Sequence, residues 1–189
     1  MGFLASLEMP NNIMMLEEKI KSSIRDVPDF PKQGIVFKDI TPILKDPKLC
    51  SEIVDGFIEQ LKEKKIDAIV STESRGFFFG FLMANKMGLP LIPLRKPGKL
   101  PYKTIFHEYK LEYGKAKVEM HIDALEKGWN VLVHDDLLAT GGTAEASAVL
   151  IQRQNANVAG FAFVVELGFL GGRKKLETYS QNIISLVKY

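Results

Sequence analysis

Short apolar runs alternate with amphipathic segments along most of this chain, and this alternation constrains the fold more than any other feature. Runs typical of buried strands lie at 67–72, 91–94, 130–134, 158–165 and 183–187. Segments with helical periodicity lie at 14–26, 51–65, 77–87 and 143–154. Parallel strands need long crossover connections, and these are usually helices. The pattern therefore predicts an α/β fold in which helices flank both faces of a parallel β-sheet.

Length and composition limit what such a fold can do. The 189 residues are enough for one domain of ordinary size, which we expect over 14–189. The formal charge of +2 is too balanced for a protein whose main work is to coat nucleic acid, so no nucleic-acid partner is expected. No apolar run reaches the roughly 20 residues of a membrane-spanning helix. The single cysteine, Cys50, fits a reducing compartment, and we expect a cytoplasmic protein.

The N-terminus is expected to be a flexible tail over residues 1–13. It also matches the loose pattern for myristoylation, with Gly2 after the initiator and Ser6 downstream. One acyl chain anchors only weakly, and no dense basic cluster follows as a second signal. We therefore expect no membrane contact unless Gly2 is myristoylated.

The decisive segment, VLVHDDLLATGGTA, spans residues 131–144. A buried strand there delivers two adjacent carboxylates, Asp135 and Asp136, at the end where open α/β sheets bind ligands. A turn and a helix start follow, and their backbone N–H groups can converge on one point: Ala139, Thr140, Gly141, Gly142 and Thr143. Two hydroxyls and a helix N-terminus add to this cradle for a phosphate dianion. The alternative is an acidic strand end running into a glycine turn and a threonine cap.

This segment resembles the phosphate-binding signature of the purine phosphoribosyltransferases. The chain is more closely similar to the adenine phosphoribosyltransferase family, from about residue 20 to the C-terminus. Four further segments carry the resemblance: FPKQGIVFKDI at 30–40, ESRGF at 73–77, RKPGKLP at 95–101 and LEYG at 111–114. One departure is His134, where the family usually has an aliphatic residue. We interpret it as a core histidine and assign it no role.

The resemblance implies a type I phosphoribosyltransferase fold with a small N-terminal hood and a flexible lid at about 95–117. The lid segment has no stable period, which also favours a long excursion with some β-hairpin. The implied reaction converts adenine and phosphoribosyl pyrophosphate into AMP and pyrophosphate, with Mg²⁺, in purine salvage. A homodimer is implied as well. The alternatives are a transferase of the same fold for another base, and a ligand-sensing regulator on this scaffold.

The resemblance also assigns roles to individual residues. Ala139 to Thr143 would bind the 5-phosphate, and Asp135 and Asp136 the ribose. Pyrophosphate would contact Ser74, Arg75, Arg95, Lys96, Lys99 and Tyr102. Adenine would be bound by Val36, Phe37, Lys38 and Leu137. Catalysis would involve Glu112 and Tyr113.

Three further expectations accompany these roles. Mg²⁺ would be held mainly by substrate oxygens and water near Asp135 and Asp136. The peptide before Ser74 is implied to be cis or strained. His107 is a weaker candidate for proton transfer. Without the resemblance, Glu112 would be interpreted as a surface glutamate and the apolar run 35–37 as core packing.

Overall fold

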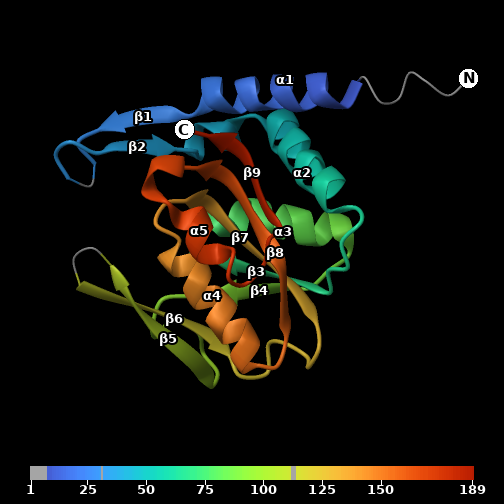
Figure 1. Cartoon of the computed structure of the whole chain (residues 1–189), viewed down its shortest axis with the longest axis vertical. Helices are drawn as coiled ribbons and strands as arrows, with labels where there is room; N and C mark the ends of the chain where they lie inside the picture. Colours follow the sequence, from blue (N-terminus) through green and yellow to red (C-terminus); the bar gives the residue numbers. More distant parts are fainter. Residues whose placement is uncertain (1–7, 31, 112–113) are drawn as a thin grey trace, which may run out of the picture. The chain divides into compact units, whose positions relative to one another are not determined.

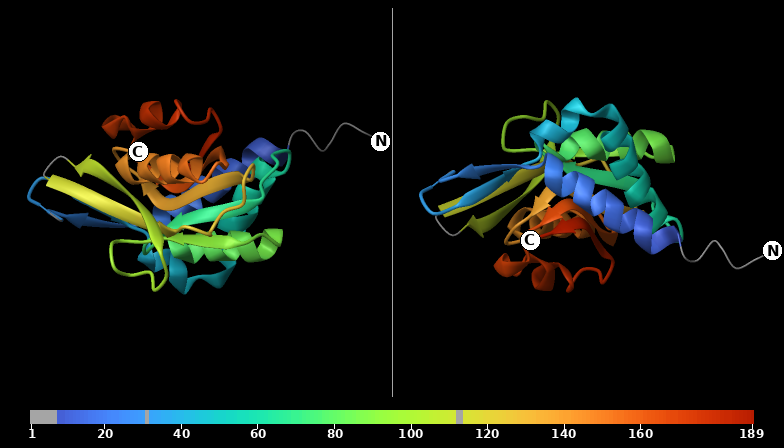
Figure 2. Two further views of the ribbon diagram at one scale, coloured as in Figure 1. Left: turned by 90° about the horizontal axis from the view of Figure 1, so that it is seen from below. Right: turned by 90° about the horizontal axis from the view of Figure 1, so that it is seen from above.

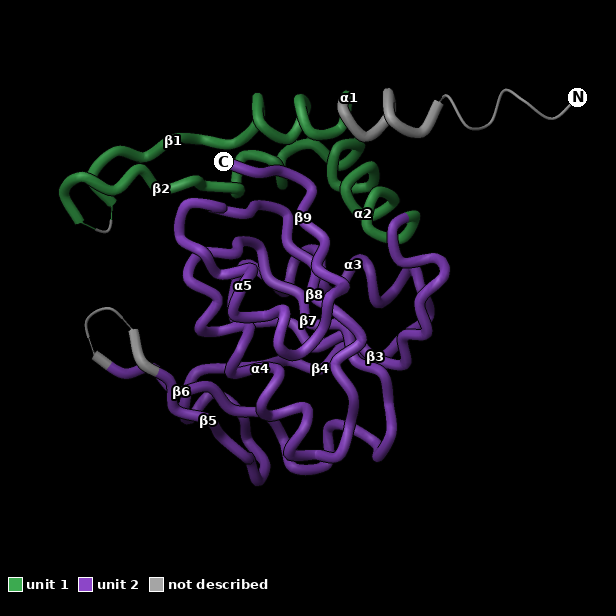
Figure 3. The backbone as a smooth tube through the Cα atoms, viewed as in Figure 1, with its two compact units in different colours: residues 1–59 green, residues 60–189 purple. Residues whose placement is uncertain are grey.

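The computed structural model describes residues 8–30, 32–111 and 114–189 (Figure 1). The chain divides into two compact units, an N-terminal unit of residues 1–59 and a C-terminal unit of residues 60–189 (Figure 3). Residues 1–7, with the possible acylation site Gly2, lie outside the described part. Within the described residues, no helix is long and apolar enough to cross a membrane.

The N-terminal unit begins with helix α1, which occupies Glu8–Ser23 where the periodicity predicted 14–26. The earlier start is compatible with Pro10, because the first turn of a helix does not use the N–H that proline lacks. Helix α1 ends before the predicted residue 26 because the residues that follow it pair in a strand. Strand β1 (Arg25–Pro28) pairs antiparallel with β2 (Val36–Asp39), so the residues after α1 belong to a hairpin.

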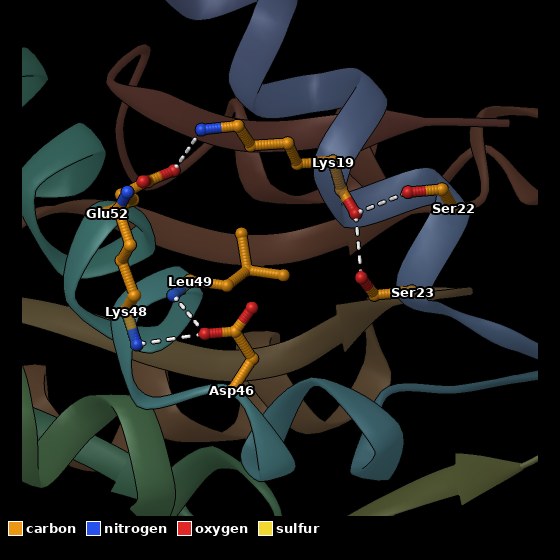
Figure 4. Close-up of polar contacts among 7 residues, drawn as sticks. All are labelled: Lys19, Ser22, Ser23, Asp46, Lys48, Leu49 and Glu52. Atoms are coloured by element: carbon orange, nitrogen blue, oxygen red, sulfur yellow. Dashed lines mark hydrogen bonds and ion pairs between the residues drawn. The ribbon is translucent and has the colours of Figure 1, made fainter.

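A short 3₁₀ helix η1 (Thr41–Lys45) leads from this hairpin to helix α2 (Pro47–Leu61). The sequence predicted α2 over 51–65. It starts earlier because Asp46 caps it, accepting hydrogen bonds from the N–H groups of Lys48 and Leu49 at 3.0 Å each (Figure 4). The start of α2 is therefore decided by a capping side chain and a proline rather than by apolar periodicity.

Helices α1 and α2 are linked within this unit by an ion pair between Lys19 Nζ and Glu52 Oε2 at 2.7 Å (Figure 4). A groove of about 290 Å³ lies beside the pair. The hydroxyls of Ser22 and Ser23 in its wall both donate to the Lys19 carbonyl, so these polar groups are used within the unit.

The C-terminal unit is built on a five-stranded sheet in the order β4-β3-β7-β8-β9. All neighbouring strands are parallel. The strands are β3 (Ala68–Thr72), β4 (Leu91–Leu94), β7 (Asn130–Leu138), β8 (Asn157–Glu166) and β9 (Ile183–Lys188). Each coincides with an apolar run in the sequence, and the prediction of a parallel sheet is confirmed.

Helices cover both faces of this sheet (Figure 2). The C-terminal unit contains α3 (Gly76–Met87), α4 (Gly142–Arg153), η2 (Gly168–Leu170) and α5 (Gly172–Leu176). Successive strand residues point to opposite faces. Val70 and Val133 belong to a buried cluster with α4 residues, whereas Ser71 and His134 lie against α3. The predicted α/β class with flanking helices is therefore confirmed.

The predicted excursion after β4 contains a hairpin of β5 (Thr104–Leu111) and β6 (Gly114–His121), which extends beyond the sheet (Figure 1). The strands continue past the predicted boundary at 117 because all eight positions of each strand pair with the other. Backbone hydrogen bonds between Arg95 and Glu119 also attach β6 to the residue that follows β4. The hairpin is therefore continuous with the edge of the sheet.

Candidate active site

The carboxyl ends of β3 and β7 meet at one edge of the sheet, because the two strands are parallel neighbours with Ser71 opposite His134. The chain passes from β3 to β4 on one side and later to β7 on the other. Such a reversal of strand order opens a crevice at the carboxyl edge, where α/β sheets bind ligands. The predicted pyrophosphate turn at 73–75 and the acidic pair at 135–136 therefore lie at the same edge.

The two predicted ribose carboxylates have different surroundings. Asp136 is 4% exposed and accepts a hydrogen bond from Arg75 Nε at 2.5 Å. Asp135 Oδ1 accepts the N–H of Asp136 at 2.9 Å. Burial raises the pKa of Asp135 well above its usual value, and the adjacent Asp136 carboxylate raises it further. One carboxylate is thus paired with a guanidinium, while the other has an increased affinity for a proton.

The predicted 5-phosphate residues form a small cavity of about 80 Å³ after β7. Its lining includes Asp135, Leu137 and every residue from Ala139 to Thr143. Gly141 has φ +78°, a left-handed conformation that glycine adopts without strain, and α4 begins directly after it. The first N–H groups of a helix lack partners within the helix, so this geometry suits an anion.

The peptide bond between Glu73 and Ser74 is cis, as the resemblance implied. The Glu73 carboxylate accepts hydrogen bonds from Arg95 Nε and from the Lys96 N–H, each at 3.0 Å. Partial burial alone would raise the pKa of Glu73, but these hydrogen bonds and the two positive charges outweigh it and lower the pKa. The turn after β3 is therefore tied to the residues that follow β4.

A larger cavity of about 380 Å³ lies beside this turn. Two predicted pyrophosphate residues, Arg95 and Lys96, line it together with Glu73 and Thr143. Sequence reasoning missed five hairpin residues that line the same cavity: Tyr109, Lys115, Ala116, Lys117 and Val118. The spacing of the two lysines could have placed them on one face of a strand, since alternate residues share a face. Tyr109 pairs with Ala116 and so lies on the other face, and no single pattern identifies the whole set.

The remaining predicted pyrophosphate residues do not line this cavity. Lys99 contributes its carbonyl oxygen to Arg95 Nη1 at 3.1 Å. The Tyr102 ring packs edge-on against His121 with centroids 6.1 Å apart and is 55% exposed. Lys99 is therefore held against Arg95, a residue of the lining, while the ring contact of Tyr102 is with His121 outside the lining.

The predicted adenine residues are divided between the two units. Leu137 lines the small cavity after β7, whereas Val36, Phe37 and Lys38 form most of β2 in the N-terminal unit. The Phe37 ring packs edge-on against Phe30 at 5.2 Å between centroids. Glu112 and Tyr113, the predicted catalytic residues, lie outside the described part of the chain.

His134 is fully buried on β7, and burial lowers its pKa to about 4. The imidazole is therefore neutral at physiological pH, and its interpretation as a core histidine is confirmed. His107, the weaker proton-transfer candidate, faces α4, with Nδ1 3.4 Å from an Arg153 nitrogen.

Gly172 is a positioning residue that sequence reasoning missed. A Cβ on Gly172 would overlap the carbonyl oxygen of Ala139 and would lie 2.9 Å from the Gly141 nitrogen. The start of α5 therefore contacts the backbone of residues 139–143, the predicted 5-phosphate loop (called the phosphate loop below), and supports it directly. The adjacent pair Gly171-Gly172 is visible in the sequence, but only the tertiary structure identifies what it touches.

The sequence was compared with protein-family models and with known proteins. The model of the phosphoribosyl transferase domain matches residues 41–184. The chain is 51% identical over 175 residues to an adenine phosphoribosyltransferase of Cytophaga hutchinsonii, covering 93% of this chain and 97% of that relative. The chain belongs to the adenine phosphoribosyltransferase family.

Solved structures of adenine phosphoribosyltransferases have the same fold. The protein from Thermoanaerobacter pseudethanolicus aligns with a TM-score of 0.88 at 49% identity, over 91% of this chain and 99% of that one. The Saccharomyces cerevisiae protein, solved with adenine and an imino-altritol bisphosphate, aligns with a TM-score of 0.85 at 38% identity, over 92% and 99%. The predicted family, its glycosyltransferase class and its adenine phosphoribosyltransferase function in purine salvage are thus confirmed. The roles of single residues stay predictions.

Proposed function

We propose that this protein transfers the phosphoribosyl group of phosphoribosyl pyrophosphate to adenine, forming AMP and releasing pyrophosphate. The observation that carries the proposal is the arrangement at the end of β7. There, Asp135 and Asp136 are followed at once by a loop of small residues that opens helix α4. A phosphate group and a ribose are therefore accommodated by consecutive residues of one segment.

The loop from Ala139 to Thr143 binds the 5-phosphate in this proposal. Backbone N–H groups of the loop and of the first turn of α4 donate to the phosphate oxygens, and the helix dipole favours negative charge there. The hydroxyls of Thr140 and Thr143 add two donors. These contacts fix the ribose over the acidic pair and so orient C1 for transfer.

Asp135 and Asp136 stabilise positive charge that develops on the ribose as pyrophosphate leaves. Arg75 orients Asp136 through their hydrogen bond. Asp135 has a raised pKa in the unliganded protein, and a nearby positive charge opposes that rise and favours its ionised form. Its interaction with the sugar is therefore stronger in the transition state than in the ground state, as catalysis requires.

Pyrophosphate binds between the turn after β3 and the residues after β4. The donors assigned to it are Ser74, Arg75, Arg95, Lys96, Lys99 and Tyr102. The cavity of about 380 Å³ with Arg95 and Lys96 in its wall supports this position. A guanidinium has five N–H donors, so pairing of Arg75 Nε with Asp136 is compatible with a phosphate on its other side. Lys115 and Lys117 also line this cavity, and each forms an ion pair with a glutamate of the hairpin.

Mg²⁺ is proposed as the cofactor. Within the described residues, no cluster of three or more His, Cys, Asp or Glu side chains could form a metal cage. Two carboxylates beside a phosphate site fit an ion that keeps several waters and is held largely by substrate oxygens, with Asp135 and Asp136 as the protein groups nearby. Bound there, Mg²⁺ would disperse the negative charge of pyrophosphate.

Adenine is read by the backbone of β2 in this proposal. Residues two apart in a strand direct their N–H and C=O groups to the same edge, so Val36 and Lys38 can pair with the amino group and a ring nitrogen of adenine. The side chain of Lys38 is paired with Asp26 at 2.7 Å, which leaves recognition to the backbone. Phe37 and Leu137 supply apolar surface for the ring.

Glu112 and Tyr113 are proposed as the catalytic residues, and 95–117 as a lid that excludes water. Glu112 would assist proton changes at N7 of adenine. The support for the lid is the position of its hairpin, five residues of which line the pyrophosphate cavity. Residues 14–189 would form the catalytic domain, with residues 1–13 as a tail.

A homodimer is proposed from the composition of α3. This helix is apolar nearly all round, and such helices are normally buried on every side. In the single chain, however, Phe78, Phe81 and Leu82 are 43%, 58% and 40% exposed. The helix begins directly after Arg75, so a second copy on this face would lie next to the pyrophosphate turn. A sedimentation mass of one chain at micromolar concentration would contradict this proposal.

A cytoplasmic location is proposed because the single cysteine of the sequence, Cys50, is a buried free thiol. Cys50 is buried, and burial raises the pKa of its thiol, which makes it a poor nucleophile and suits a structural role in a reducing compartment. Membrane contact through an acylated Gly2 would be detected by mass spectrometry of the protein from its native source.

The proposed function is tested by steady-state turnover with phosphoribosyl pyrophosphate, Mg²⁺ and one base at a time. Adenine should support turnover, and hypoxanthine and guanine should not, because a 6-oxopurine presents the reverse donor and acceptor pattern to the β2 backbone. Preference for another base would assign the protein to a different transferase of this fold. Tight ligand binding with no turnover on any base would indicate a regulator.

A further inference from the structure

A hydrogen bond between two side chains joins the loop of residues 139–143 to the described part of the hairpin. Tyr109 Oη on β5 lies 2.9 Å from Thr143 Oγ1 in the first turn of α4. Both residues line the cavity of about 380 Å³, and Thr143 also lines the smaller phosphate cavity. Thr143 is thus shared by the two cavities, and Tyr109 reaches it from the hairpin.

The hairpin contacts α4 at both ends of the helix. At the C-terminal end, Arg153 Nη1 donates to the Phe106 carbonyl oxygen at 3.0 Å. At the N-terminal end the contact is the Tyr109–Thr143 bond, and the Tyr109 ring packs against the core of this unit. Of these two contacts, the second involves a residue of the loop 139–143, so it is the one that a ligand in the loop would affect directly.

Hydroxyl chemistry sets the direction of this hydrogen bond once a phosphate is bound. A phosphate dianion only accepts hydrogen bonds, and the hydroxyl of Thr143 has a single proton to donate. If Thr143 donates that proton to the phosphate, its oxygen can only accept from Tyr109. The phenol then donates, and the two hydroxyls form a chain that ends on the ligand and is strengthened by its charge.

We propose that Tyr109 is a positioning residue that couples occupation of the phosphate loop to docking of the β5–β6 hairpin on α4. The proposal rests on the proposed function, because it requires a phosphorylated ligand at Thr143. With the loop occupied, Tyr109 orients the Thr143 hydroxyl toward the phosphate. In return, the phosphate strengthens the attachment of the hairpin to α4.

The first test compares Tyr109→Phe with the wild type and with Tyr179→Phe. The control removes a hydroxyl from another partly buried tyrosine that packs on the same core and lines neither cavity. Calorimetry should show that Tyr109→Phe weakens AMP and ribose 5-phosphate about fivefold to tenfold, as loss of one hydrogen bond between uncharged groups implies. Adenine affinity should not change, and Tyr179→Phe should bind all three ligands as the wild type does.

A double-mutant cycle separates coupling from a general loosening of the hairpin. Thr143→Val removes the hydroxyl while keeping the shape, and Thr143→Ser retains it. Tyr109→Phe should add no further loss of AMP affinity to Thr143→Val, but should again cost about fivefold beside Thr143→Ser. An additive loss in the Val background would overturn the proposal and leave Tyr109 as a packing residue.

Amide hydrogen exchange tests the reciprocal effect, which linkage requires. AMP should slow exchange in α4 and in the described parts of β5 and β6 of the wild type. In Tyr109→Phe, saturating AMP should still protect α4 but no longer the hairpin. Equal hairpin protection in both proteins would contradict the coupling. Failure of the wild type to bind AMP or ribose 5-phosphate would instead contradict the proposed function, so the two failures are distinguishable.

Discussion

The contact between Gly172 and the phosphate loop predicts a severe effect from the smallest possible substitution. In Gly172→Ala the added Cβ would overlap the Ala139 carbonyl oxygen and approach the Gly141 nitrogen to 2.9 Å. Optimal contacts between carbon and other heavy atoms are about 3.5–4.0 Å, so the loop and the start of α5 must separate by about 1 Å. The phosphate loop therefore moves although the substituted residue does not belong to it.

The start of α5 cannot move away from the loop without breaking other contacts. Arg173, the next residue of α5, makes two hydrogen bonds to Glu166 at 2.9 and 2.7 Å and one to the Ile183 carbonyl oxygen at 3.1 Å. Leu176 of the same helix is fully buried. The displacement is therefore shared with the loop, whose N–H groups converge on the phosphate in the proposed function. A misplacement of about 1 Å at such a site can cost about 10²-fold in rate.

The assay measures kcat/KM for phosphoribosyl pyrophosphate, AMP affinity and the free energy of unfolding for Gly172→Ala. We expect kcat/KM to fall by about 10²-fold, with a stability loss of about 1–3 kcal/mol from overpacking. The matched control is Gly168→Ala, because the nearest atom to its Cβ, the Tyr189 carbonyl oxygen, lies at 3.4 Å. A folded Gly172→Ala protein with wild-type kcat/KM and AMP affinity would refute the reasoning.

Three other substitutions test separate parts of the molecule. Gly142→Val should abolish calorimetric binding of AMP and phosphoribosyl pyrophosphate in a folded protein, because a branched side chain would occupy the place where backbone meets the 5-phosphate; unchanged affinity would refute that placement. Glu112→Gln should lower kcat for adenine by about 10²-fold with little change in AMP affinity, and a wild-type kcat across pH would remove its catalytic role. Arg173→Met should lower the free energy of unfolding at pH 7 by roughly 2 kcal/mol, below the range for fully buried pairs because the Arg173 side chain is 29% exposed. The Arg173 hydrogen bond is the main cause that lowers the pKa of Glu166 below 4.5 in the folded protein. The full loss of stability is therefore expected above pH 4.5, and the loss should shrink as the pH falls through the lowered pKa of folded Glu166. A difference in urea unfolding between the two proteins that does not change with pH would contradict the assignment.

The sequence by itself determined the order and type of the sheet elements in the C-terminal unit. Buried parallel strands are continuous apolar runs, and β3, β4, β8 and β9 coincide with such runs within one residue at each end. The loop of small residues that follows β7 was equally readable, while its role in binding phosphate stays a prediction. Its position at the end of β7 follows from chain order, and no distant contact is needed to define it.

Element boundaries in the N-terminal unit depended on capping and pairing rather than on periodicity. Helix α2 begins at Pro47 because Asp46 caps it, and α1 gives way to β1 because Arg25 pairs with Asp39. A capping side chain is a local signal that apolar periodicity overlooks. A strand pair needs a partner on another segment, so its register is not contained in either segment alone.

Only the tertiary structure decided which residues support the site. Gly172 lies 31 positions beyond Gly141, and Tyr109 lies 34 positions before Thr143, so no local pattern connects either pair. Such contacts arise when the sheet brings α5 beside the phosphate loop and the hairpin beside α4. Residues that touch a ligand leave a motif because chemistry restricts their type and spacing. Residues that act by contact across the fold leave none, because only packing restricts them.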